Sequence, residues 1–145
     1  MGDPFYCKTV TIWNKYVDDL WEKEVWIPAV IENVRLLVSR GNNVQNSGNT
    51  AADSVRLHIS DALSKSQKRY LPYAEWAALE IAEREVYYTL ESENNSFFVE
   101  GDSSKEDGSA QPNFFEYMKE HYANCFRITS VDRFEVIPHF EVWGK

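Results

Sequence analysis

The chain has 145 residues, a formal net charge of −8 and a pI near 4.9. The charge and the pI argue against a surface that binds DNA phosphates, because such a surface needs clustered Lys and Arg. Hydrophobic residues make up 43% of the chain and aromatic residues 14%, and this composition excludes disorder throughout. The length fits one domain, residues 1–145, with one hydrophobic core.

The positions of the cysteines and the hydropathy of the chain predict the cellular compartment of the protein. Cys7 and Cys125 stand far apart and belong to no C-x-x-C pair, so neither a zinc site nor a disulfide framework is predicted. No run of about eighteen apolar residues occurs, and the opening MGDPFY lacks the basic start of a signal peptide. These features predict a protein made and kept in a reducing cytoplasm.

The first third of the chain predicts strands and one long loop. Residues 7–16, CKTVTIWNKY, alternate β-branched and aromatic residues and predict a strand. The stretch VWIPAVIENVRLLVSR predicts two strands around a kink, because Pro28 cannot donate to a β-ladder. Residues 39–53 are rich in Asn, Gly and Ser and predict a long mobile loop, with its turn-forming positions at Gly41, Asn42, Asn43, Asn46, Gly48 and Asn49.

The middle of the chain mixes strands with a helix. SVRLHIS predicts a half-buried strand with Val55, Leu57 and Ile59 inward. PYAEWAALEIAERE favours a short helix that begins near Pro72. VYYTL and FFVEG, separated by ESENNS, predict a hairpin, and residues 101–111 predict a second solvated loop.

The last third predicts a helix and a closing hairpin. PNFFEYMKEHYAN places Phe114 or Phe115, Met118 and Tyr122 on one helical stripe that packs against the sheet. Residues 126–145 read as two strands joined by a charged turn. Together the elements predict a mainly-β, antiparallel small barrel or sandwich with one or two short α-helices.

The chain shows no motif for catalysis, for a metal or for a cofactor. His58, His121 and His139 are scattered in sequence, so only the fold brings them together, and no Gly-rich stretch opens a helix as a phosphate loop does. We therefore expect no enzyme, no catalytic residue, no metal and no cofactor. A small hydrolase with a carboxylate or His site is the alternative of another class, and it requires a deep pocket with convergent, perturbed titratable groups.

Large aromatic residues are abundant for a domain of this size. One interpretation places them in a core with partly exposed edges. The other places some of them at contacts between subunits, where Trp, Tyr and Phe concentrate. The candidates for such contacts are Trp13, Trp26, Trp76, Phe140 and Trp143.

Several short segments resemble a family of small bacteriophage structural proteins of the head-tail junction. They are TVTIWNKY, AADSVRLHI, EWAALE, YYTL with FFVEGD, ITSVD and the ending HFEVWGK, in that order. The chain departs from the family pattern where ESENNS replaces a tight Gly-Asp turn and where Trp-Gly-Lys replaces a terminal Gly-Gly-Lys.

This resemblance implies a non-enzymatic virion component, either a head-closure (stopper) protein or a connector subunit. It implies a homo-oligomeric ring that contacts portal or connector and tail proteins in the virion neck and is assembled in the bacterial host cytoplasm. DNA would pass through the lumen without specific binding, as an acidic wall permits, and no membrane is involved. A tail-completion or tail-terminator protein is the near alternative.

Overall fold

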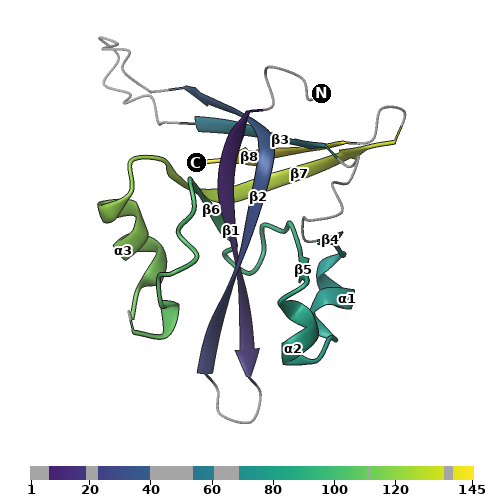
Figure 1. Cartoon of the computed structure of the whole chain (residues 1–145), viewed down its shortest axis with the longest axis vertical. Coiled ribbons are helices and arrows are strands. Elements are labelled where there is room, and N and C mark those ends of the chain that lie inside the picture. The colour runs from purple at the N-terminus through teal and green to yellow at the C-terminus, as the bar shows by residue number, and fades with distance from the viewer. Residues whose placement is uncertain (1–6, 19–22, 40–53, 61–68, 111, 136–138) are drawn as a thin grey trace.

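The computed structural model of the chain describes residues 7–18, 23–39, 54–60, 69–110, 112–135 and 139–145. Six strands close an antiparallel barrel in the order β1-β2-β3-β8-β7-β6 (Figure 1). The predicted mainly-β, antiparallel fold with a few short helices is confirmed, and it is a barrel. Its strands are β1 (Lys8–Asp18), β2 (Lys23–Ser39), β3 (Ser54–Ser60), β6 (Phe97–Glu100), β7 (Cys125–Phe134) and β8 (His139–Gly144).

β2 is one continuous strand, so the prediction of two strands around a kink at Pro28 is wrong. Residues 23–34 pair with β1, and residues 35–39 pair with β3. Pro28 lies in the stretch that pairs with β1, and proline is tolerated where a ladder has only one side. The irregularity comes at Asn33, whose φ of 58° is left-handed and which lies beside a register shift between Lys8 and Val10.

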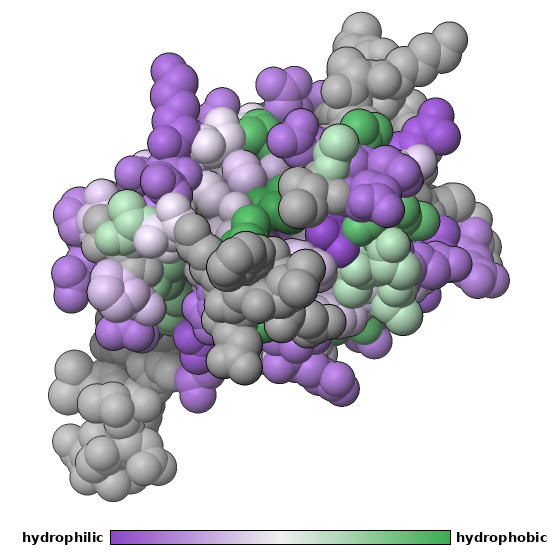
Figure 2. All heavy atoms as spheres, turned by 90° about the horizontal axis from the view of Figure 1, so that it is seen from below, coloured by the Kyte–Doolittle hydropathy of each residue, from purple (hydrophilic) through white to green (hydrophobic). Residues whose placement is uncertain are grey.

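The β1–β2 pair extends beyond the barrel wall as a two-stranded ribbon. β6 pairs with β1 only between Val10 and Trp13, whereas the β1–β2 ladder continues to the pair Asp18 and Lys23. Helix α3 lies on one side of this ribbon, and the helices α1 and α2 lie on the other (Figure 1). Seen from the ribbon end, hydrophilic residues dominate the surface, with smaller apolar areas between them (Figure 2).

The interior of the barrel is the first hydrophobic core, as the alternation of SVRLHIS predicted. Val55, Leu57 and Ile59 are buried, and Phe140 and Val142 of β8 face the same core.

The predicted closing hairpin is confirmed, since β7 and β8 pair antiparallel from Ile128 and Gly144 to Phe134 and His139. The predicted loop at 39–53, with Gly41, Asn42, Asn43, Asn46, Gly48 and Asn49, falls outside the described residues from position 40 on.

A second core packs α3 (Phe114–His121) against the outside of β1 and β6. Phe114, Phe115 and Met118 are buried in it, as the helical stripe predicted, although the helix is shorter than the segment 112–124. Trp13 of β1 lies edge-on to Phe114, with ring centroids 4.8 Å apart. No helix in the described ranges is long and apolar enough to cross a membrane.

The segment at 101–111 is more ordered than the predicted solvated loop. Ser103 is buried, and its Oγ accepts a hydrogen bond of 3.0 Å from the indole N–H of Trp13. The short 3-10 helix η1 (Gly108–Ala110) packs on Trp26, and Gly108 is buried there. Ser103 and Gly108 thus face the interior, whereas Asp102, Lys105, Asp107, Ser109 and Ala110 are exposed, as the predicted solvated loop requires.

The predicted hairpin between VYYTL and FFVEG does not form. β5 (Tyr87–Tyr88) pairs in parallel with β4 (Arg69–Tyr70), whereas β6 has β1 and β7 as its two neighbours. Both edges of β6 are therefore occupied by other strands, and none remains for residues 86–90. The helical prediction for residues 72–85 is confirmed as two short pieces, α1 (Tyr73–Ala77) and α2 (Ile81–Arg84).

Candidate functional site: the outer barrel face

The outward side of four neighbouring strands forms one continuous surface. Along β3 the side chains alternate, so Arg56 and His58 point outward while their neighbours fill the core. Strand β8 alternates in the same way. We call this surface the outer barrel face; it comprises Arg35, Leu37 and Ser39 of β2, Ser54, Arg56, His58 and Ser60 of β3, His139, Glu141 and Trp143 of β8, and Ser130, Asp132 and Phe134 of β7.

Strand register arranges these side chains in transverse rows. One row crosses all four strands, because Arg35 pairs with His58, His58 with Glu141, and Glu141 with Asp132. Side chains that stand directly opposite on adjacent strands lie close enough to interact. The row therefore joins charged and titratable groups from β2, near the start of the chain, with groups from β7 and β8, at its end.

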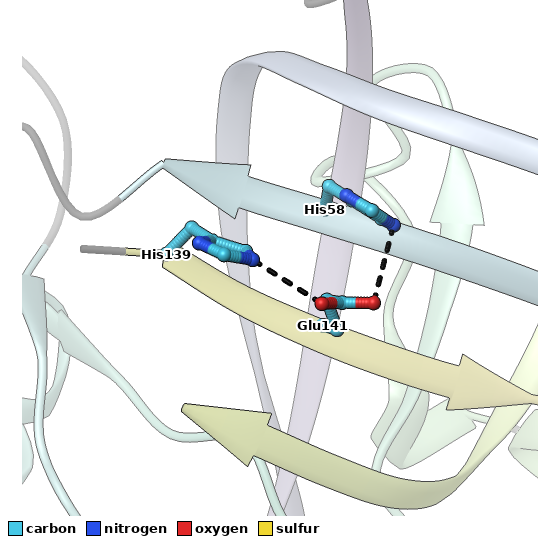
Figure 3. A network of polar contacts seen from close by, with 3 residues as sticks. All are labelled: His58, His139 and Glu141. Atoms are coloured by element: carbon cyan, nitrogen blue, oxygen red, sulfur yellow. Dashed lines mark hydrogen bonds and ion pairs between the residues drawn. The ribbon is translucent and has the colours of Figure 1, made fainter. Parts of the chain in front are cut away.

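Two histidines bracket one carboxylate at the centre of the face. His139 Nε2 lies 3.2 Å from Glu141 Oε2, and His58 Nε2 lies 3.6 Å from Glu141 Oε1 (Figure 3). The two imidazole rings are nearly parallel, with their centroids 6.0 Å apart. Glu141 thus hydrogen-bonds His139 on its own strand, whereas the buried Nε2 of His58 on β3 lies near the carboxylate without a hydrogen-bond partner among the described residues.

Burial affects the protonation of His58. Burial is the main cause that lowers the pKa of His58 below its ordinary value, while the charge of Glu141 acts in the opposite direction. The cations of Arg35 and Arg56 also lower the pKa of His58. Burial therefore favours the neutral form of the His58 imidazole over its charged form.

Aromatic and apolar groups surround the cluster. The guanidinium of Arg56 lies over the Trp143 ring, 4.1 Å from its centroid. Phe134 stacks on His139, with centroids 4.7 Å apart and planes 7° apart. Leu37 is 39% exposed and Phe134 is 43% exposed, so each presents apolar surface to the solvent.

The titratable groups at the centre of this face are two imidazoles and one carboxylate. Two imidazoles that share a carboxylate add positive charge when they are protonated. In the described parts of the chain, no group of three or more His, Cys, Asp or Glu side chains is arranged to hold a metal ion. His121 stays apart from the other two histidines, on α3, with its Nδ1 2.7 Å from the Tyr117 carbonyl oxygen.

Two small clefts lie elsewhere. One, of about 230 Å³, is lined by Tyr73, Leu90 and Glu91 together with Ser92, Glu93, Asn94 and Val131. Burial, helped by the charge of Glu91, raises the pKa of Tyr73. The other, of about 190 Å³, lies between the ribbon and the start of α3, and Lys15 and Arg127 are among its lining residues. Neither lining includes a residue of the histidine cluster.

The predicted contact residues occupy two different environments. Trp13, Trp76 and Phe140 are buried inside the domain, which fits the core interpretation. Trp26 and Trp143 are partly buried, and only Trp143 lies on the outer barrel face. A contact role for Trp26 and Trp143 stays a prediction.

Sequence reasoning missed the histidine cluster. One signal was present, because His139 and Glu141 are two positions apart on a strand and must share a face. The position of His58 opposite Glu141 depends on the register between β3 and β8, which sequence alone does not fix.

The fold and the face define an acidic, mainly-β barrel with polar and aromatic side chains together on one outer face. The chain belongs to a family of unknown function (DUF6751), which it matches over residues 5–145. Comparison with curated proteins and with solved structures finds no match.

Proposed function

We propose that this protein is a structural subunit of a bacteriophage virion, acting as a head-closure (stopper) or connector subunit in a homo-oligomeric ring at the head-tail junction. The proposal starts from the resemblance of TVTIWNKY, AADSVRLHI and ITSVD to that class of proteins. In this role the subunit contacts portal or connector and tail proteins, and DNA passes through the lumen without specific binding. A net charge of −8 suits such a channel, because an acidic wall repels the DNA backbone.

The outer barrel face is the observation that carries the proposal. Exposed Leu37 and Phe134, with the half-buried Trp143, give it apolar anchors. At its centre, Glu141 is hydrogen-bonded to His139, and His58 Nε2 lies 3.6 Å from the same carboxylate. A surface with aromatic anchors and pre-positioned polar groups is typical of a protein contact.

A tail-completion or tail-terminator protein is the near alternative, and particle fractionation separates the two roles. In lysates of a phage that encodes this chain, tail-defective mutants accumulate heads and head-defective mutants accumulate tails. We expect mass spectrometry to find the chain on purified heads, and immunogold labelling of complete virions to mark the neck. A chain found only on free tails supports the terminator role, and particles that lack the chain overturn the proposal.

A further inference from the structure

The charges on the outer barrel face are segregated by strand. Its two cations, Arg35 and Arg56, stand on β2 and β3. Its two carboxylates, Glu141 and Asp132, stand on β8 and β7. The face therefore has a basic half, on β2 and β3, and an acidic half, on β8 and β7.

The two halves turn toward opposite sides of the subunit. In the closed order β1-β2-β3-β8-β7-β6, β2 and β7 are three strands apart whichever way the barrel is followed. Arg35 and Asp132 thus stand at the two ends of a row that runs half-way around the barrel. The ends of the row cannot meet within one subunit, but they can meet between two.

Each half also carries one exposed apolar side chain. Leu37 lies two positions beyond Arg35 on β2, and Phe134 lies two positions beyond Asp132 on β7. They are two of the four large hydrophobic side chains that are exposed in the described parts of the chain; the other two are Val17 and Val86. Each side of the barrel therefore combines a charge with an apolar contact, and the charges are opposite.

Three further charges on these strands lie outside the transverse rows. On β7, exposed Arg127 lies over the Phe115 ring of the second core, 4.3 Å from its centroid. The other two are Arg133 and Glu32. The guanidinium of Arg133 lies over the rings of Tyr70 and Phe140, at 5.8 and 5.3 Å from their centroids, and Phe140 belongs to the core. Glu32 precedes the irregularity at Asn33 and lies outside the part of β2 that pairs with β3. Neither residue belongs to the transverse rows of the face.

We propose that neighbouring copies of this chain join head-to-tail, with the basic half of one copy against the acidic half of the next. This inference rests on the proposed function and specifies its contact. Different surfaces on two sides of a subunit form a heterologous contact, which closes into a ring when the rotation between copies allows. The contact also offsets the repulsion between copies that each carry a net charge of −8.

Charge reversal at the two ends of the row tests the contact. Arg35→Glu makes the basic half acidic, and Asp132→Arg makes the acidic half basic. The matched controls are Lys105→Glu and Glu120→Arg, two exposed residues away from the face. Self-association of each purified chain is measured by analytical ultracentrifugation and native mass spectrometry near physiological salt, and circular dichroism verifies the fold.

We expect each reversal to weaken self-association by about tenfold or more, and the controls to leave it within about twofold of wild type. An equimolar mixture of the two variants restores assembly, because each variant keeps the half that the other needs. This restoration also shows that both variants fold.

The outcomes separate the inference from the proposed function. If wild-type chains assemble and neither reversal weakens assembly, or if the mixture fails to assemble although both variants fold, the head-to-tail contact is overturned while the ring subunit stands. If wild-type chains stay monomeric at high concentration, the head-to-tail contact is overturned, whereas the proposed function is decided by whether purified heads carry the chain.

Discussion

The side-chain amide of Asn14 pairs with the peptide groups of Thr89 as a neighbouring strand would. Asn14 Nδ2 donates to the Thr89 carbonyl oxygen at 2.8 Å, and the Thr89 N–H donates to Asn14 Oδ1 at 3.0 Å. Nδ2 also donates to Ser96 Oγ at 3.1 Å. One buried side chain on β1 therefore fixes the chain after β5 and the entry to β6.

Replacing Asn14 with Ala is expected to lower the free energy of unfolding by about 2 kcal/mol or more, because the buried N–H and C=O of Thr89 lose their partner. Urea denaturation followed by circular dichroism measures the change. The matched control is Asn113→Ala, since exposed Asn113 makes no side-chain capping bond at the start of α3. Equal losses in the two variants would show that the Asn14 pairing adds nothing specific.

Gly108 lies against Trp26 with no room for a side chain. A Cβ at position 108 would come within 2.6 Å of Trp26 Cδ1 and 2.7 Å of its Cβ. Gly108→Ala should therefore cost about 1–3 kcal/mol of stability, as overpacking does. In a double-mutant cycle with Trp26→Leu, measured by thermal and urea unfolding, the cost of Gly108→Ala should fall. An unchanged cost would assign the effect to the backbone and not to the indole.

Acidification should destabilise the protein through His58. Its folded pKa is lowered from the ordinary 6.5, mainly by burial, so the unfolded chain binds this proton at a higher pH than the folded chain does. The free energy of unfolding contributed by His58 is therefore lost as the pH falls below about 6.5. His58→Gln should lose less stability than wild type between about pH 7 and pH 5. A proton NMR titration of His58 with a midpoint at or above 6.5 would contradict this expectation.

The two cysteines should react very differently. Cys7 is exposed, whereas Cys125 is buried, and burial raises the pKa of Cys125 to about 12. Since the thiolate is the reactive form, Ellman's reagent should titrate one thiol quickly in the native protein and two in denaturant. The variant Cys7→Ser should show no fast phase. A fast phase in that variant would mean that the second core opens readily around Cys125.

Local sequence patterns correctly predicted the elements whose burial or pairing does not depend on a distant strand. The period of SVRLHIS fixed which side of β3 is buried, and the stripe Phe114, Phe115 and Met118 fixed the packed side of α3. The closing hairpin needed only its two strands and a turn. In each of these cases, alternation or helical spacing alone decided the result.

Long-range pairing explains what sequence did not reveal. VYYTL and FFVEG look like a hairpin, but β6 finds β1 and β7, and Asn14 takes the place of a strand beside Thr89. The position of His58 opposite Glu141 likewise depends on the register between β3 and β8. Competition between alternative strand partners decided these contacts, and no short segment of the sequence shows which partner wins.

The continuity of β2 has a mechanical consequence. One strand runs from the projecting ribbon, where it pairs with β1, into the barrel wall, where it pairs with β3 and carries Arg35 and Leu37. Between these parts lies Asn33, with its left-handed φ of 58°, and no loop. Tilting the ribbon tip must therefore strain or break ladder hydrogen bonds, so a load applied at the tip reaches the basic half of the outer barrel face through the backbone itself.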